Sequence, residues 1–132
     1  MGRMNELPTE LNWVSRRVEC SSTQIFRELQ KGIEDDVATV NKTSDSEFGT
    51  TLTSDGRTFV VSEKRATGAR VVFFISGKKI EIRNEVSGVN LVAVPALNTV
   101  GRCVLTVDGV ELEQWQLRKM ALEGLFFSEM DD

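Results

Sequence analysis

Residues 70–83 read RVVFFISGKKIEIR, and this stretch decides the fold class. From 79 to 83, isoleucines alternate with charged side chains, and a period of two predicts a strand with one buried and one solvated face. From 71 to 75 every residue is apolar, which predicts a central strand covered on both faces. Only Gly77 and Lys78 separate the two segments, so the strands they form must pair in antiparallel fashion.

Similar segments recur on both sides of this pair. Upstream, Asp55 and Gly56 lie between two extended segments, and an Asp-Gly pair in that position is typical of a β-hairpin. Downstream, Pro95 ends a strand or marks a sheet edge. The sequence therefore predicts an antiparallel meander of five to six strands, drawn from residues 48–53, 57–62, 70–76, 79–83, 89–94 and 102–107.

A long amphipathic helix is predicted before the strands. Residues 22–41 carry apolar side chains at helical spacing, and Ser21 followed by Gln24 predicts a capping box at the start. Gly32 weakens this helix but would let another backbone approach closely. Residues 12–20 fit either a strand or a short helix, and we favour helical or irregular structure.

A second helix is predicted after the strands, over residues 111–123, with Gly124 as its C-terminal cap. The spacing of Trp115 with the neighbouring leucines favours a core position for this side chain. Phe126 and Phe127 follow the predicted cap. They either staple the end of the chain to the domain or cross into another subunit, which makes them candidate self-association residues.

This order of elements predicts one α+β domain over residues 1–132. The expected architecture is an N-terminal helix, an antiparallel meander of five to six strands and a C-terminal helix, with both helices packed on one sheet face. About 1–10 and 128–132 are expected to be flexible because they are polar and terminal.

The two cysteines, Cys20 and Cys103, are too few to suggest a disulfide-stapled secreted domain. The alternation around Cys103 predicts a small buried side chain there. The first residues of the chain contain no apolar stretch of the kind found in a signal peptide. We therefore expect a cytoplasmic protein that does not act at a membrane.

Several residue types needed for common catalytic sites are absent. The chain has no histidine and no tyrosine, so the usual general base and the usual neutral metal ligand are missing. Adjacent carboxylates at 34–36 point about 100° apart on a helix and cannot converge on one ion. No glycine-rich phosphate loop occurs. The sequence predicts no catalytic, metal-binding or cofactor-binding residue and no enzymatic activity.

Charge is distributed unevenly along a chain whose net charge is −4. Residues 57–83 carry a net charge of +5, so the remainder carries −9. These basic residues either contact an anion or an acidic partner, or they only keep strand faces in contact with water and protect sheet edges from aggregation. The candidate contacts are Arg57, Lys64, Arg65, Arg70, Lys78, Lys79 and Arg83.

Three hypotheses for function remain. The leading one is a non-enzymatic binding or protein-interaction module that pairs with a protein partner or with itself as a homodimer. The alternative is a small-molecule or lipid-binding domain, whose apolar ligand would lie in a cavity between the sheet and the helices. The further alternative, which we do not favour, is nucleic-acid binding through a basic stripe in residues 57–83.

Overall fold

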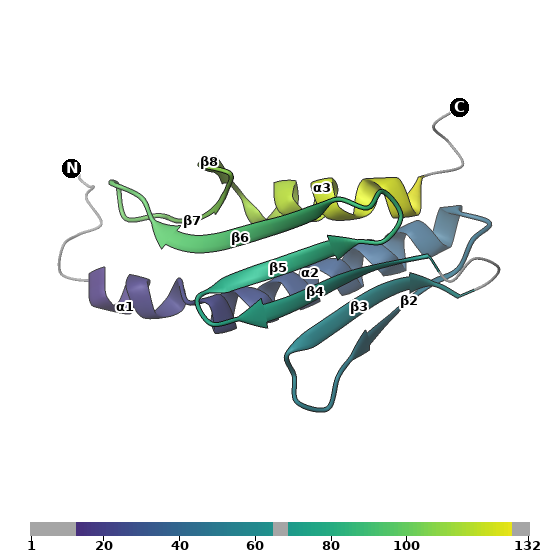
Figure 1. Cartoon of the computed structure of the whole chain (residues 1–132), viewed down its shortest axis with the longest axis horizontal. Coiled ribbons are helices and arrows are strands. Elements are labelled where there is room, and N and C mark those ends of the chain that lie inside the picture. The colour runs from purple at the N-terminus through teal and green to yellow at the C-terminus, as the bar shows by residue number, and fades with distance from the viewer. Residues whose placement is uncertain (1–12, 65–68, 128–132) are drawn as a thin grey trace.

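The computed structural model describes residues 13–64 and 69–127, and it confirms the α+β class. In Figure 1 the strands form one layer, and α2 and α3 lie together behind it. The predicted flexible ends, about 1–10 and 128–132, lie outside the described residues. The helices are α1 (Trp13–Glu19), α2 (Ser22–Thr43) and α3 (Gln114–Phe126), and the strands are β2 (Phe48–Leu52), β3 (Thr58–Glu63), β4 (Arg70–Ser76), β5 (Lys79–Asn84), β6 (Asn90–Leu97), β7 (Cys103–Val107) and β8 (Val110–Leu112).

The sheet is an antiparallel meander in which the order of the strands in space is their order in the chain. It has seven strands and not five to six, because the first residues of the predicted second helix form β8. Asp108 and Gly109 adopt positive φ values of 52° and 80°, which suit the two-residue turn that joins β7 to β8. Helix α3 begins only after Glu113, which forms a capping box with Gln116.

One face of the sheet and the inner sides of α2 and α3 form a single core. Phe59 and Phe73 lie at its centre with 2% and 0% of their surface exposed. Burial of this apolar surface is the main force that holds the layers together. The helices supply Ile25, Phe26, Leu29, Ile33, Val37 and Val40 from α2, and Leu117, Ala121, Leu122 and Leu125 from α3.

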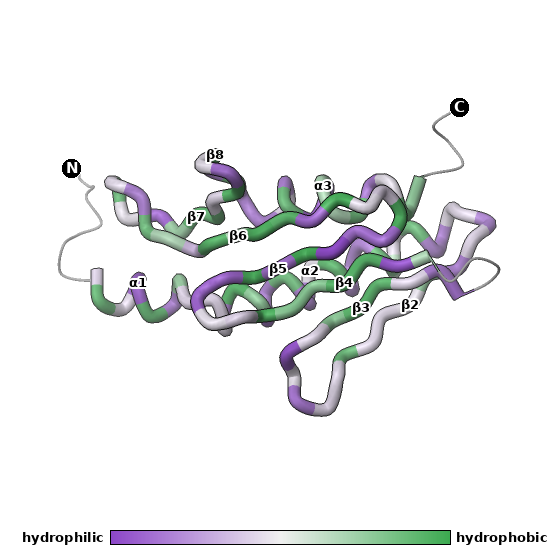
Figure 2. The backbone as a smooth tube through the Cα atoms, viewed as in Figure 1, coloured by the Kyte–Doolittle hydropathy of each residue, from purple (hydrophilic) through white to green (hydrophobic). Residues whose placement is uncertain are grey.

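Within residues 13–64 and 69–127, no long helix covers the other face of the sheet. Val72 and Phe74 of β4 lie on this face and are only partly buried, so the prediction that β4 is covered on both faces is wrong. The guanidinium of Arg83 stacks on the Phe74 ring at 5.0 Å from its centroid, which shields part of the ring from water. Figure 2, which colours the backbone by residue hydropathy, shows hydrophobic stretches along β4 and β6.

Pro95 lies inside β6 and does not end it. Strand β5 pairs with Asn90–Ala93 of β6, whereas β7 pairs with Val94–Leu97. Beyond Ala93 one side of β6 is therefore a local edge, where a residue without an N–H is tolerated.

Ser21 is the N-cap of α2, as predicted, and its hydroxyl accepts a hydrogen bond from the backbone N–H of Gln24 at 3.2 Å. The Gln24 side chain does not complete the capping box, because it donates to Glu28 instead. Residues 13–19 form helix α1, which agrees with the helical alternative, but none of them is buried. Within the part of the chain that the structure describes, no helix is long and apolar enough to cross a membrane.

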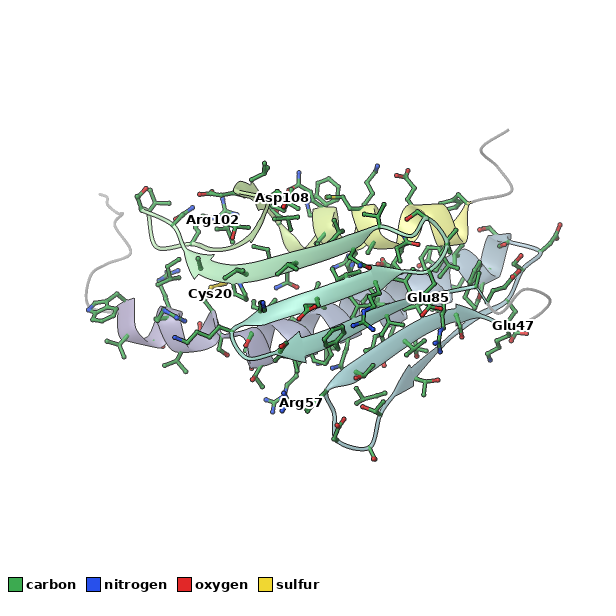
Figure 3. All side chains as sticks on the ribbon, in the orientation of Figure 1. Cys20, Glu47, Arg57, Glu85, Arg102 and Asp108 are labelled. Carbon is green, nitrogen blue, oxygen red and sulfur yellow. A yellow bond between two sulfur atoms is a disulfide. The ribbon has the colours of Figure 1, made fainter. Side chains whose placement is uncertain are left out.

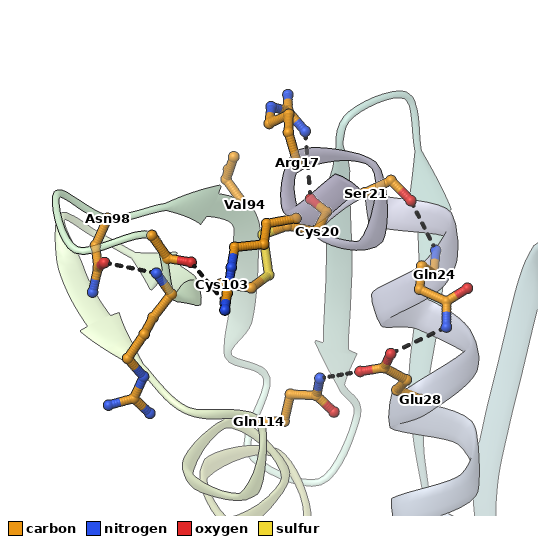
Figure 4. Close-up of a disulfide and its surroundings, with 12 residues drawn as sticks. Arg17, Cys20, Ser21, Gln24, Glu28, Val94, Asn98, Cys103 and Gln114 are labelled. Carbon is orange, nitrogen blue, oxygen red and sulfur yellow. Dashed lines mark hydrogen bonds between the residues drawn. A yellow bond between two sulfur atoms is a disulfide. The ribbon is translucent and has the colours of Figure 1, made fainter. Parts of the chain in front are cut away.

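Cys20 and Cys103 form a disulfide, which the low cysteine count does not suggest. The bond joins the α1–α2 junction to the start of β7, with Cα atoms 5.4 Å apart across a sequence separation of 83 residues (Figure 4). Cys20 is fully buried, but Cys103 is exposed and not the buried strand residue predicted. A disulfide typically contributes about 2–4 kcal/mol to the free energy of unfolding, and the contribution grows with the length of the loop that it closes.

The adjacent Phe73 and Phe74 provide a test of the one-sided core. Phe73→Ala should lower the free energy of unfolding by about 3–5 kcal/mol, because it leaves a cavity in the core. Phe74→Ala should cost about 1 kcal/mol, since its ring is only partly buried and mainly supports Arg83. Urea unfolding of both variants measures the difference. Equal losses at the two positions would contradict a sheet covered on one face.

Candidate functional site

The seven arginines and lysines predicted to contact an anion or an acidic partner do not form one stripe. Lys64 lies 3.6 Å from the Glu47 carboxylate, and Arg70 pairs with Glu85 at 2.8 Å. Figure 3 shows Glu47 and Glu85 at one end of the central strands and Arg57 at the other. Two of the seven charges are therefore neutralised by pairing at the end away from Arg57. Arg65 lies outside the described residues, and Arg83 stacks on the open sheet face.

Three of the predicted basic residues remain together at the other end. Arg57 precedes β3, and its carbonyl accepts a hydrogen bond from the N–H of Ile75 near the end of β4 at 3.0 Å. Lys78 lies in the turn that follows β4, and Lys79 begins β5. This end of the sheet therefore carries a local excess of positive charge.

At this end lies a cleft of about 460 Å³, between the first turns of α2 and the turns at residues 53–57 and 77–78. Its lining adds Arg27, which the sequence pattern places only on the solvated face of α2. Helical spacing could have indicated this position, because Thr23, Arg27 and Gln30 recur at intervals that bring them to one side of a helix. The full lining is Thr23, Phe26, Arg27, Gln30, Leu52, Asp55, Gly56, Arg57, Ile75 and Gly77. We call this hollow the hairpin cleft.

Asp55 organises one wall of the hairpin cleft. Its Oδ1 accepts hydrogen bonds from the Thr53 hydroxyl at 2.6 Å and from the Arg57 backbone N–H at 3.0 Å. These two bonds hold the pKa of the Asp55 carboxyl below its usual value, the hydroxyl of Thr53 being the larger cause. The carboxylate is therefore ionised near neutral pH, and both of its hydrogen bonds stabilise its own turn.

A second hollow, of about 410 Å³, runs between the C-terminal half of α2 and the outer side of α3. Trp115 lines it and is 53% exposed, so the predicted core position of this residue is wrong. The buried side of α3 is set by Leu117 and the residues that follow it at helical spacing, and Trp115 points about 160° from Leu117. We call this hollow the helix groove, and its lining is Asp36, Thr39, Val40, Thr43, Trp115, Arg118, Lys119, Leu122, Glu123, Phe126 and Phe127.

The two terminal phenylalanines lie differently in this groove. The Phe126 ring packs edge-on against Phe48 at 5.0 Å between centroids, so it staples the end of α3 to β2. Phe127 contacts Phe126 edge-on at 6.2 Å and keeps 39% of its surface exposed. Gly124 lies inside α3 and is not its cap, which is Phe127.

The charged residues of the helix groove pair with one another. Arg118 donates to Asp36 at 2.8 Å, and Lys119 donates to Glu123 at 2.9 Å. Gly32 permits the first pair, because a Cβ at that position would lie 2.8 Å from the Arg118 Cζ. The close approach predicted at this glycine is thus made by a side chain and not by a backbone. The groove as a whole presents aromatic surface with balanced charge.

Within the described ranges 13–64 and 69–127, no group of three or more carboxylates and cysteines is placed to hold a metal ion. Glu111 lies in β8 and Glu113 caps α3, so neither lies in a helical turn, although the sequence predicts a helix that begins at residue 111.

Comparisons of the chain with protein-family models, with curated proteins and with solved structures found no match. We therefore infer the function from the hairpin cleft, the helix groove and the residues that line them.

The hydrogen bonds of Asp55 yield a titration test. In an NMR pH titration the Asp55 carboxyl should have a lowered pKa, and Thr53→Val should raise it towards the usual value by removing a donor. Because the folded-state pKa lies below that of the unfolded chain, these bonds stabilise the fold above the unfolded-state pKa and lose this effect as the pH falls through the folded-state value. Thr51→Val, in the same hairpin, is the control and should leave the Asp55 pKa unchanged. An unshifted Asp55 in the parent protein would contradict the turn geometry.

Proposed function

We propose that this domain is a non-enzymatic protein-interaction module that forms a homodimer through the helix groove. The observation that carries the proposal is Trp115, a large aromatic side chain that is 53% exposed on the rim of a 410 Å³ hollow. Tryptophan is among the residues most enriched at the energetic centres of protein interfaces. Phe127, at the end of the same groove, adds a second exposed ring.

The groove and the protruding rings share one surface, which favours a second copy of the chain as the occupant. A twofold dimer requires a self-complementary surface, because the same patch faces itself. About a twofold axis beside α3, Trp115 of each copy would enter the groove of the other. The aromatic surface of both copies would then leave water.

The charge pattern of the groove also suits association between identical copies. The ion pairs of Asp36 with Arg118 and of Glu123 with Lys119 balance the charge within each copy. Two such surfaces meet without strong like-charge repulsion, although each chain carries a net charge of −4. A highly charged partner would find few unpaired charges to bind there.

Light scattering coupled to size exclusion should find a dimer, and Trp115→Glu should convert it to a monomer, because a buried unpaired charge would face the partner. Met120→Glu is a matched control: Met120 lies on the same helix, is 48% exposed and does not line the groove. It should remain a dimer. Both variants should still unfold cooperatively on heating, since both side chains are solvent-exposed in the single chain. A monomeric parent protein, or a monomeric Met120→Glu variant, would refute this mode of pairing.

We infer further that the domain works in an oxidising compartment and not in the cytoplasm as the sequence suggests. The observation behind this inference is that both cysteines of the chain join in one disulfide. Such bonds persist in secreted, periplasmic and other oxidising environments and are rare in the cytosol.

Thiol trapping in the host cell tests this compartment. Cells are treated with an alkylating reagent before lysis, and the mass of the protein is then measured without reduction. The expected protein carries no alkyl group, because its thiols are already joined; a parallel sample reduced before alkylation carries two and is the control. Two alkyl groups on the unreduced protein would place it in a reducing compartment.

A further inference from the structure

We propose that the hairpin cleft is a binding site for an organic oxyanion, a ligand with one acidic head group on a short apolar body. This site is separate from the helix groove. It is lined by the first turns of α2, through Gln30, whereas the groove begins at Asp36. The proposal therefore does not depend on the homodimer.

Two guanidinium groups line this cleft from opposite walls. Arg27 projects from α2, and Arg57 follows the turn of the β2–β3 hairpin. Neither guanidinium makes a salt bridge or a side-chain hydrogen bond to any residue within 13–64 or 69–127. Their N–H donors are thus available, and guanidinium matches the geometry of carboxylate and phosphate oxygens.

Neutral donors are added beside the arginines. Thr23 and Gln30 line the same wall as Arg27, and in the described part of the chain neither side chain is engaged in a hydrogen bond. A hydroxyl and a side-chain amide can complete the coordination of an oxyanion that the arginines attract. The cleft thus gathers four polar side chains that make no side-chain hydrogen bond within the described residues, although Arg57 also interacts electrostatically with Asp55.

The lining also contains an apolar part. Phe26 lines it although only 3% of its surface is exposed, Ile75 is partly buried, and Leu52 is 46% exposed. A volume of about 460 Å³ lies within the usual range for small-molecule sites. An anion with an apolar body would therefore remove more surface from water here than a bare inorganic ion.

The walls are braced before any ligand arrives. The Ser22 hydroxyl donates to the Gly77 carbonyl at 2.8 Å and ties α2 to the β4–β5 turn. On the other wall, Asp55 and Thr53 close the hairpin turn through side-chain bonds to the backbone of Arg57 and Thr58. Such bracing reduces the ordering that binding would otherwise require.

Asp55 limits the charge of the ligand. Its ionised carboxylate lines the cleft beside the two arginines, so the three groups together carry a net charge of +1. A singly charged head group matches this balance, whereas each further negative charge on a ligand inside the cleft would face the Asp55 carboxylate. The shared chemistry is one oxyanion head, which either a carboxylate or a phosphate ester supplies.

Calorimetric titration with octanoate and octyl phosphate tests the two possible head groups. The controls are 1-octanol, which has the apolar body without a charge, and acetate and inorganic phosphate, which have the charge without the octyl chain. At least one octyl anion should bind saturably and at least tenfold more tightly than 1-octanol and than its own bare head group. The better of the two anions identifies the head. The Trp115→Glu variant should bind with unchanged affinity, which separates this site from the proposed dimer.

Arg27→Gln and Arg57→Gln should each weaken the preferred octyl anion about tenfold or more. Neither variant should unfold the domain, because both side chains are exposed and the turn bonds of Arg57 use its backbone N–H. Lys31→Gln removes the same charge one turn farther along α2, outside the cleft lining, and should leave the affinity unchanged. The proposal is overturned if neither octyl anion binds saturably, if 1-octanol binds as tightly, or if the two arginine variants bind like Lys31→Gln.

Discussion

Burial of the apolar stripe of α2 against one face of the meander is the constraint on which the rest of the structure depends. Six side chains of this 22-residue helix are buried against the sheet. The strands contribute four buried side chains to the same core, all between 0% and 2% exposed: Phe59, Phe73, Ile80 and Ile82. Because the sheet alternates its side chains between two faces, this burial also determines which strand residues remain on the open face.

The two hollows arise where this packing ends. A long helix laid across a twisted sheet meets the turns at one end, and the hairpin cleft is the space left between the start of α2 and those turns. At the other end of α2, α3 lies beside it on the same face of the sheet (Figure 1), and the helix groove runs between their outer sides. Both candidate sites are therefore consequences of a helical layer that covers the sheet from one side.

The disulfide and the network beside it hold the start of the helical layer. Cys20 joins the beginning of α2 to β7, and Gln114 at the start of α3 donates to Glu28 of α2 at 2.7 Å (Figure 4). These contacts bring together segments that are more than 80 residues apart in the chain. The beginnings of α2 and α3 are thereby fixed relative to the sheet whose end forms the hairpin cleft.

The sequence by itself determined the class of fold, the positions of α2 and of six strands to within a few residues, and their antiparallel order. Those features are encoded locally, because alternation, helical spacing and turn residues such as Asp55-Gly56 act between neighbours in the chain. Only the tertiary structure decided that Cys20 meets Cys103, that Arg27 lies across a cleft from Arg57, and that Trp115 faces water. These three outcomes depend on how distant elements are layered and on the rotation of each helix about its axis, and no local pattern specifies either.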